Sequence, residues 1–282
     1  MWLSGKLLIL FNLLFTLFCF GQTSFNWEEF VKKAEKYYNS LEKVGIQNFS
    51  SLITSDTYLN YLKTNNYDST FYYPLKFIWT NQEKVYYILQ PHPNMNNEEK
   101  RKKDLIEIQA VKNQFKGFLL DWQNFMFYTP FVDIPKNPTI KVGKDTIQVS
   151  YVSGEGDLQA KVKKLFLPSG LLLKVTVTSK NNKVITTPIF TDREGKWLCL
   201  GWDSQIFVNG QVTSGTATRL EVYKVNKYWM PSRATMLIQT AEKPEDKYLL
   251  TLYFKEYTFN LTLQEITSQK ENQPESRSQK EN

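Results

Sequence analysis

Few residues in this chain have the types and spacing that catalysis or metal binding requires. The only histidine, His92, stands between Pro91 and Pro93, and we expect it to be exposed in a loop. A serine triad, a cysteine–histidine pair or a multi-histidine zinc site needs histidine beside other reactive groups. A single histidine in such a setting gives little support for this chemistry.

The acidic turn Gly154-Glu155-Gly156-Asp157 is the remaining pattern that could carry chemistry. Two carboxylates could form the acid–base pair of a glycosidase or part of a calcium site. Glycine-flanked acids are also typical of a hairpin tip, the role that we favour. The turn lacks the lysine and hydroxyl residue of a phosphate-binding loop. A carboxylate-dependent hydrolase is therefore a secondary hypothesis, and we expect no catalytic residue, no metal and no cofactor.

The first 21 residues have the three parts of a secretory signal peptide. Lys6 gives a positive start, an apolar run extends from Leu7 to Phe18, and Gly21 is a small residue before a cleavage site at Gln22. The run is short for a membrane span, which needs about 20 apolar residues. We therefore predict a periplasmic or secreted protein with no transmembrane span. An uncleaved anchor is the alternative.

The composition is that of a globular protein rich in aromatic residues. Hydrophobic residues make up 41%, charged residues 22% and aromatic residues 15%, and the net charge is +7. The one dense basic cluster, Lys100-Arg101-Lys102-Lys103, follows two glutamates, which is typical of a solvated helical turn. We expect no nucleic-acid partner. Because Cys19 lies in the signal, Cys199 has no cysteine to pair with and is expected to be a small buried residue.

Helical periodicity marks two main segments. An apolar face from Trp27 to Leu41, with Asn26 as the N-cap, predicts an N-terminal helix that stops near Gly45. A second apolar stripe, from Leu105 to Trp122, predicts a helical insert over residues 98–127. Gly117 is a candidate break within this insert.

Most of the remaining chain has short aromatic and β-branched runs typical of strands. Some lie between residues 46 and 90, and a longer series lies between residues 144 and 263, with Asn209-Gly210 as the strongest hairpin signal. Strands joined by short turns pair antiparallel, and a long meander must curl or close to protect its edges. We predict an α+β fold: a strongly curved antiparallel sheet, an unclosed β-barrel of about ten or more strands, with an N-terminal helix and the helical insert as a lid.

The chain is expected to form one domain over residues 22–263 and to act as a monomer. The last residues, 264–282, are polar, and the sequence Ser268-Gln269-Lys270-Glu271-Asn272 recurs at the C-terminus. Such a segment buries too little apolar surface to fold, so we predict a disordered tail.

The order of these elements resembles the LolA/LppX-like superfamily. The segment Tyr228-Trp229-Met230-Pro231-Ser232-Arg233, followed by a strand over residues 252–260, is similar to the end of outer-membrane lipoprotein-sorting relatives, where a W-x-P strand precedes the last strand. Members of this superfamily are periplasmic lipoprotein or lipid carriers in which an unclosed barrel wraps a helical lid. The resemblance implies an apolar cavity for acyl chains, although the insert here is larger than in the smallest members.

The aromatic side chains have two interpretations. They can fill a solid core, or they can line a cavity that a curved sheet leaves under its helices. The cavity interpretation predicts a carrier or sensor that binds lipid or lipoprotein acyl chains. The alternative is a cell-envelope protein-interaction module with a filled core and no ligand. On the first interpretation the candidate ligand-binding residues are Trp79, Trp122, Phe125, Phe127, Trp197, Trp202, Phe207 and Trp229.

Overall fold

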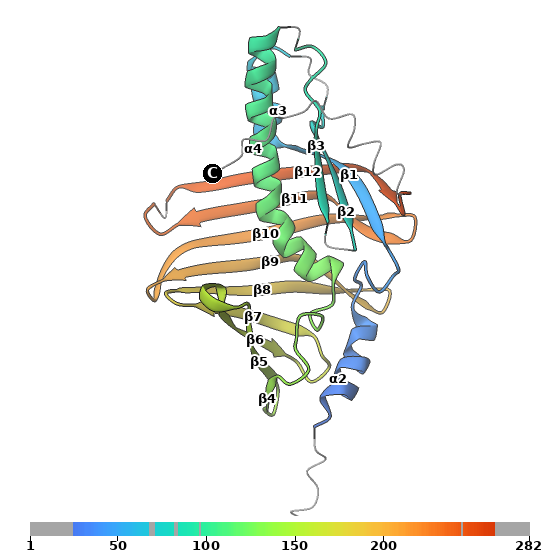
Figure 1. The fold of residues 1–282 in the computed structure, drawn as a ribbon, viewed down its shortest axis with the longest axis vertical. Helices are drawn as coiled ribbons and strands as arrows, with labels where there is room; N and C mark the ends of the chain where they lie inside the picture. Colours follow the sequence, from blue (N-terminus) through green and yellow to red (C-terminus); the bar gives the residue numbers. More distant parts are fainter. Residues whose placement is uncertain (1–24, 68–70, 82–83, 96, 244, 263–282) are drawn as a thin grey trace, which may run out of the picture.

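The computed structural model describes residues 25–67, 71–81, 84–95, 97–243 and 245–262. The predicted signal peptide and C-terminal tail lie outside these residues. The described chain forms one antiparallel sheet of 12 strands with three α-helices (Figure 1). Within this part of the chain, no helix has the length and apolar character that crossing a bilayer requires.

The helical segments are short except for one. They are α2 (Trp27–Ala34), η1 (Glu35–Tyr37), α3 (Asp56–Thr64), α4 (Glu98–Trp122), a π-helical turn η2 (Gln123–Phe127) and η3 (Gly156–Leu158). The strands are β1 (Asn48–Ser55), β2 (Leu75–Thr80), β3 (Val85–Leu89), β4 (Thr139–Val142), β5 (Ile147–Ser153), β6 (Ala160–Phe166), β7 (Leu172–Ser179), β8 (Asn182–Arg193), β9 (Lys196–Val208), β10 (Gln211–Val225), β11 (Tyr228–Thr240) and β12 (Lys247–Phe259).

The strand order follows the chain with one exception. Strands β4 to β12 form a continuous meander, and β1 pairs with β12, so that the order is β3-β2-β1-β12-β11-β10-β9-β8-β7-β6-β5-β4. The sheet has two free edges, β3 and β4, and is therefore not closed. The prediction of a large, unclosed antiparallel sheet with helices is confirmed. Helix α4 runs diagonally across one face of the sheet, here called the inner face (Figure 1).

The predicted N-terminal helix is shorter than expected. Asn26 caps it as predicted, its side chain accepting a hydrogen bond from the backbone N–H of Glu29 at 3.1 Å. Beyond η1 the chain becomes extended, because Tyr38 pairs with Trp197 and its hydroxyl donates to the carbonyl of Gly170 at 2.8 Å. Long-range contacts therefore replace the last helical turns.

Three further expectations from the sequence can be compared with the structure. Helix α4 continues through Gly117, so the expected break there is wrong. Strand β4 was not predicted, since it lies before residue 144, where the expected series of strands began. The hairpin at Asn209-Gly210 is confirmed, since both residues have positive φ angles, 50° and 81°, as a type I′ turn requires.

The first half of α4 is held by a buried carboxylate. Asp104 is fully buried; one of its oxygens accepts from the Tyr58 hydroxyl at 2.8 Å and the other from the backbone N–H of His92 at 2.9 Å. His92 is therefore not exposed, as its proline-flanked position suggested, but 96% buried, since only 4% of its surface is accessible. This histidine belongs to the contact that joins α4 to α3.

Aromatic rings fill the space between the second half of α4 and the inner face. The Trp122 ring centroid lies 4.7 Å from that of Phe127, 5.4 Å from Phe118 and 5.6 Å from Phe254. Offset and edge-to-face contacts of this kind add stability beyond the area that they bury. The insert is thus fixed to the sheet by aromatic packing.

Gly170 offers a test of how tightly α2 is docked. Its φ is +94°, and a Cβ there would overlap the Cβ of Ala34 on α2. We expect Gly170→Ala to lower the free energy of unfolding by about 3 kcal/mol, from backbone strain and overpacking together. Gly210→Ala is the matched control, with a φ of +81° but open space around it, and should cost only about 1 kcal/mol. Urea unfolding measures both, and equal losses would contradict close docking of α2.

Candidate ligand-binding site

A cavity lies where helical coverage of the inner face ends. It has a volume of about 370 Å³ and is bounded by the end of α4, by η2 with the following loop, and by β6, β7 and β8. It is more enclosed than the two grooves beside α2, and most of its surface is apolar. The lining residues are Leu120, Asp121, Asn124, Phe125, Tyr128, Thr129, Pro130, Val132, Asp133, Val162, Lys164, Leu172, Val175, Val177, Val184 and Thr186.

Strand alternation builds the floor of the cavity. Side chains two apart on a strand share a face, and the register aligns these positions across three strands. One row crosses the sheet through Val162, Val177 and Val184. The neighbouring row consists of Lys164, Val175 and Thr186. The floor is therefore mostly valine, with one cation and one hydroxyl.

The π-helical turn builds the roof. Helix α4 ends at Trp122, and η2 supplies Asn124 and the buried ring of Phe125 to the cavity. A π-turn widens the helix, and such turns are frequent at functional sites.

Two apolar side chains of the lining remain open to solvent: Leu120 is 65% exposed and Val132 54%. They mark an apolar mouth.

Lys164 is a buried cation whose charge is compensated. Its ammonium forms an ion pair with Asp133 and donates to the carbonyl of Pro130 at 2.8 Å. Burial lowers the pKa of Lys164, and the Asp133 carboxylate partly opposes this effect. Asp133 also accepts a hydrogen bond from the Tyr151 hydroxyl. The pair is thus part of a small polar network at one side of the cavity.

Asp121 is an acid in an apolar setting with no cation to balance it. Burial raises the pKa of its carboxyl to about 6, and a hydrogen bond from the Trp202 side chain partly opposes the rise. Among the residues that the structure describes, no lysine or arginine forms an ion pair with Asp121. A carboxyl with such a raised pKa inside a cavity is a typical marker of a functional site.

Four of the eight aromatic residues proposed as ligand contacts are core residues. Each has at most 1% of its surface exposed: Trp79, Trp122, Phe127 and Trp202. They pack against neighbouring rings and are not among the residues that line the cavity. Trp202 nevertheless reaches the site indirectly, through its hydrogen bond to Asp121.

The other four aromatic residues are spread over the molecule. Phe125 lines the cavity, with its ring centroid 5.5 Å from that of Trp202. Phe207 and Trp229 are half-buried, each under a lysine ammonium, at 5.1 Å and 5.3 Å. Trp197 lies beside α2, where it lines a groove with Phe30 and Tyr37. The structure therefore brings one of the eight into the cavity and keeps Trp202 beside it.

Sequence reasoning missed the valines of the floor and Asp121. The valines belong to three separate strands, and only the register of the sheet brings them together. Asp121 lies one position before Trp122, at the edge of the apolar stripe of the insert. An acidic residue beside the apolar stripe of a helix was the one sequence feature that could have indicated this site.

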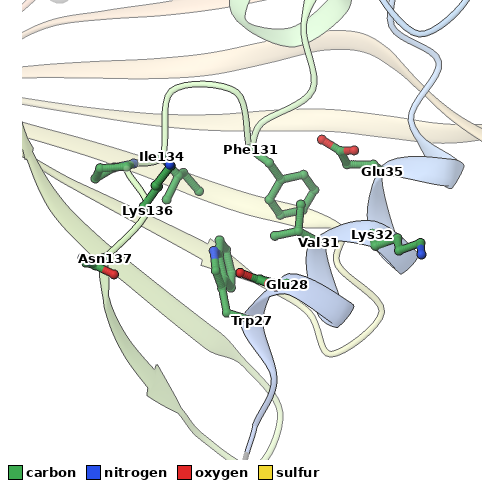
Figure 2. Close-up of a pocket in the computed structure, with 10 residues that line it drawn as sticks. Trp27, Glu28, Val31, Lys32, Glu35, Phe131, Ile134, Lys136 and Asn137 are labelled. Carbon is green, nitrogen blue, oxygen red and sulfur yellow. The ribbon is translucent and has the colours of Figure 1, made fainter.

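A second hollow lies on the surface between α2 and the loop after η2. Figure 2 shows Trp27 and Val31 of α2 near Phe131 and Ile134 of the loop, with charged side chains around them. This groove has a volume of about 610 Å³ but is open to solvent. The rings of Trp27 and Phe131 are 6.0 Å apart, so it is the surface of a packed contact that holds α2.

The acidic turn lies outside the cavity lining. Glu155 is exposed in the connection between β5 and β6, where a hairpin tip was expected. In the described part of the chain, no three histidine, cysteine or acidic residues are grouped as a metal site would require. The hydrolase hypothesis stays an untested alternative.

No family model matches this chain, and neither does any curated protein or solved structure. The function must therefore be inferred from the site itself.

The raised pKa of Asp121 makes a prediction about stability. A carboxyl whose pKa rises on folding stabilises the protein fully below its unfolded pKa, near 4, and this contribution is lost as the pH rises through about 6. Asp121→Asn removes the cost of the charge. It should raise the free energy of unfolding by about 1–2 kcal/mol at pH 7.5, a value discounted for solvent screening, and leave it nearly unchanged at pH 4.

Urea unfolding of both forms at the two pH values measures this difference. Asp145→Asn, an exposed acid in the turn before β5, is the control and should change stability little at either pH. A destabilised Asp121→Asn protein at pH 7.5 would contradict the account.

Proposed function

We propose that this chain is an exported carrier or sensor that binds the acyl chain of a lipid or lipoprotein in the cavity between α4 and strands β6–β8. The observation that carries the proposal is the cavity itself, which is partly enclosed, mostly apolar and about 370 Å³ in volume. Ligand sites are typically of roughly 300–1,000 Å³ and have apolar walls with a few polar groups. This cavity has both properties.

An acyl chain suits the shape and chemistry of the walls. The valine rows of β6, β7 and β8 and the ring of Phe125 offer apolar contacts on opposite sides. Burial of apolar surface contributes roughly 25 cal/mol per Å². The exposed side chains of Leu120 and Val132 would guide an apolar chain into the mouth.

The arrangement of elements supports the carrier role. In the proposal, the end of α4 and η2 act as a lid over the floor, as the resemblance to LolA/LppX-like carriers implies. Exchange of ligand then requires this end of the insert to move. The predicted signal peptide would place the protein in the periplasm or outside the cell, where lipid and lipoprotein carriers operate.

A second candidate is a cell-envelope interaction module with no ligand. The aromatic core favours it, because the rings of Trp79, Trp122 and Phe127 are fully buried and pack against one another. The two candidates differ at the end of the insert. A carrier needs the cavity there to accept a ligand. The function of an interaction module would not change if the cavity were filled.

Filling the cavity tests the proposal. Val184→Trp places a large ring in the floor without removing a packed side chain, so it should weaken binding of an acyl ligand at least about tenfold. Displacement of the uncharged probe N-phenyl-1-naphthylamine by decan-1-ol measures the binding. Val212→Trp, at an exposed valine outside the cavity, is the matched control and should bind as the parent protein does.

Two results would contradict the carrier proposal. One is a parent protein that binds neither the probe nor decan-1-ol. The other is equal binding by the parent and Val184→Trp proteins, which would place the ligand elsewhere on the molecule.

A further inference from the structure

The ionisable groups of the cavity indicate the charge of the head group that its ligand carries, if the proposed function holds. The acidic and basic residues that line it are Asp121, Asp133 and Lys164. The charge of Lys164 is taken up by its ion pair with Asp133, and a second of its N–H bonds is used by the carbonyl of Pro130. Asp121 is left as the uncompensated charge.

The balance of charge is negative where a ligand head group would lie. Asp121 stands on the last turn of α4, next to the exposed Leu120 of the mouth. An interaction between charges is several-fold stronger in such a partly buried place than in water. A carboxylate head group would be repelled there, and an ammonium head group would be attracted.

Asp121 also lowers the stability of the free protein, because its carboxylate is partly buried without a cation. Residues of this kind are commonly kept for function rather than for stability. Asparagine has nearly the same shape as aspartate. Its side-chain oxygen would accept the hydrogen bond from the Trp202 side chain without carrying a charge. The carboxylate therefore needs a reason beyond packing, and a cationic ligand group supplies one.

We propose that the ligand of this cavity is an acyl-chain amphiphile whose head group carries a protonated amine, and that Asp121 receives this amine at the mouth. The chain lies between Phe125 and the valine floor, and the ammonium forms an ion pair with the carboxylate. Asp121 thereby sets specificity for the head group, whereas the apolar walls accept the chain of any such amphiphile.

The groups around Asp121 define the pH dependence. Asp133 and Lys164 face the same cavity, and the buried thiol of Cys199 on β9 interacts with Asp121 from the sheet. Burial raises the pKa of Cys199 to about 12, so it stays neutral. Burial raises the pKa of the Asp121 carboxyl to about 6, so its charge is lost as the pH falls through that value. Binding of an ammonium ligand should therefore weaken as the pH falls through about 6.

Three ligands with the same ten-carbon chain test the proposal: decylamine, decan-1-ol and decanoate, each below its micellar concentration. Their inhibition constants are measured by displacement of N-phenyl-1-naphthylamine at pH 7.5 and at pH 5. At pH 7.5 we expect decylamine to bind about tenfold more tightly than decanoate, with decan-1-ol between them. At pH 5 the advantage of decylamine over decan-1-ol should shrink, although decylamine itself remains charged.

Two variants locate the effect. Asp121→Asn should lose the preference for decylamine over decan-1-ol at pH 7.5. Asp145→Asn, at an exposed acid that does not line the cavity, should keep that preference. The comparison of the three ligands on the parent protein tests the proposal by itself. The test therefore stands even if a variant folds poorly.

The outcomes separate this proposal from the function on which it rests. Equal binding of the three ligands, or tightest binding of decanoate, overturns the role of Asp121 while leaving acyl binding intact. A preference for decylamine that survives in Asp121→Asn also overturns it. Failure of all three ligands to displace the probe contradicts the acyl-binding function itself.

Discussion

The size of the inner face relative to the helix that crosses it determines the rest of the structure. A helix of 25 residues is about 37 Å long and about 10 Å wide, whereas twelve strands about 4.8 Å apart form a sheet about 55 Å across. Helix α4 therefore covers only a stripe. Aromatic rings fill the space beneath that stripe, and where the helix ends the valine rows of β6–β8 remain under a thin roof.

The sequence predicted those features that depend on local residues. The hairpin at Asn209-Gly210, the cap at Asn26 and the helix over residues 98–122 follow from turn chemistry and periodicity. It failed where distant residues decide the outcome. Tyr38 leaves the helix because of a hydrogen bond to Gly170. The backbone of His92 is held by Asp104, and its ring is packed against Tyr72.

The site was harder to predict than the fold for the same reason. Aromatic type alone does not tell a core residue from a wall residue, and rings such as Trp122 and Trp202 are fully enclosed by their neighbours. The floor depends on a register that spans three strands, and small valines give no signal in sequence. Two charged residues of the cavity also differ in a way that only the structure reveals: Lys164 has an ion-pair partner, whereas the ion pairs of the described residues leave Asp121 without one.

The central claim is that an acyl chain lies between η2 and the β6–β8 floor. A crystal structure of the mature protein with 10-bromodecan-1-ol tests it most directly, because bromine scatters anomalously and reports its own position. The account predicts an anomalous peak inside the cavity, in contact with Phe125 or the valines of β7 and β8. A cavity filled by side chains in the crystal, or bromine bound only elsewhere on the molecule, would contradict it.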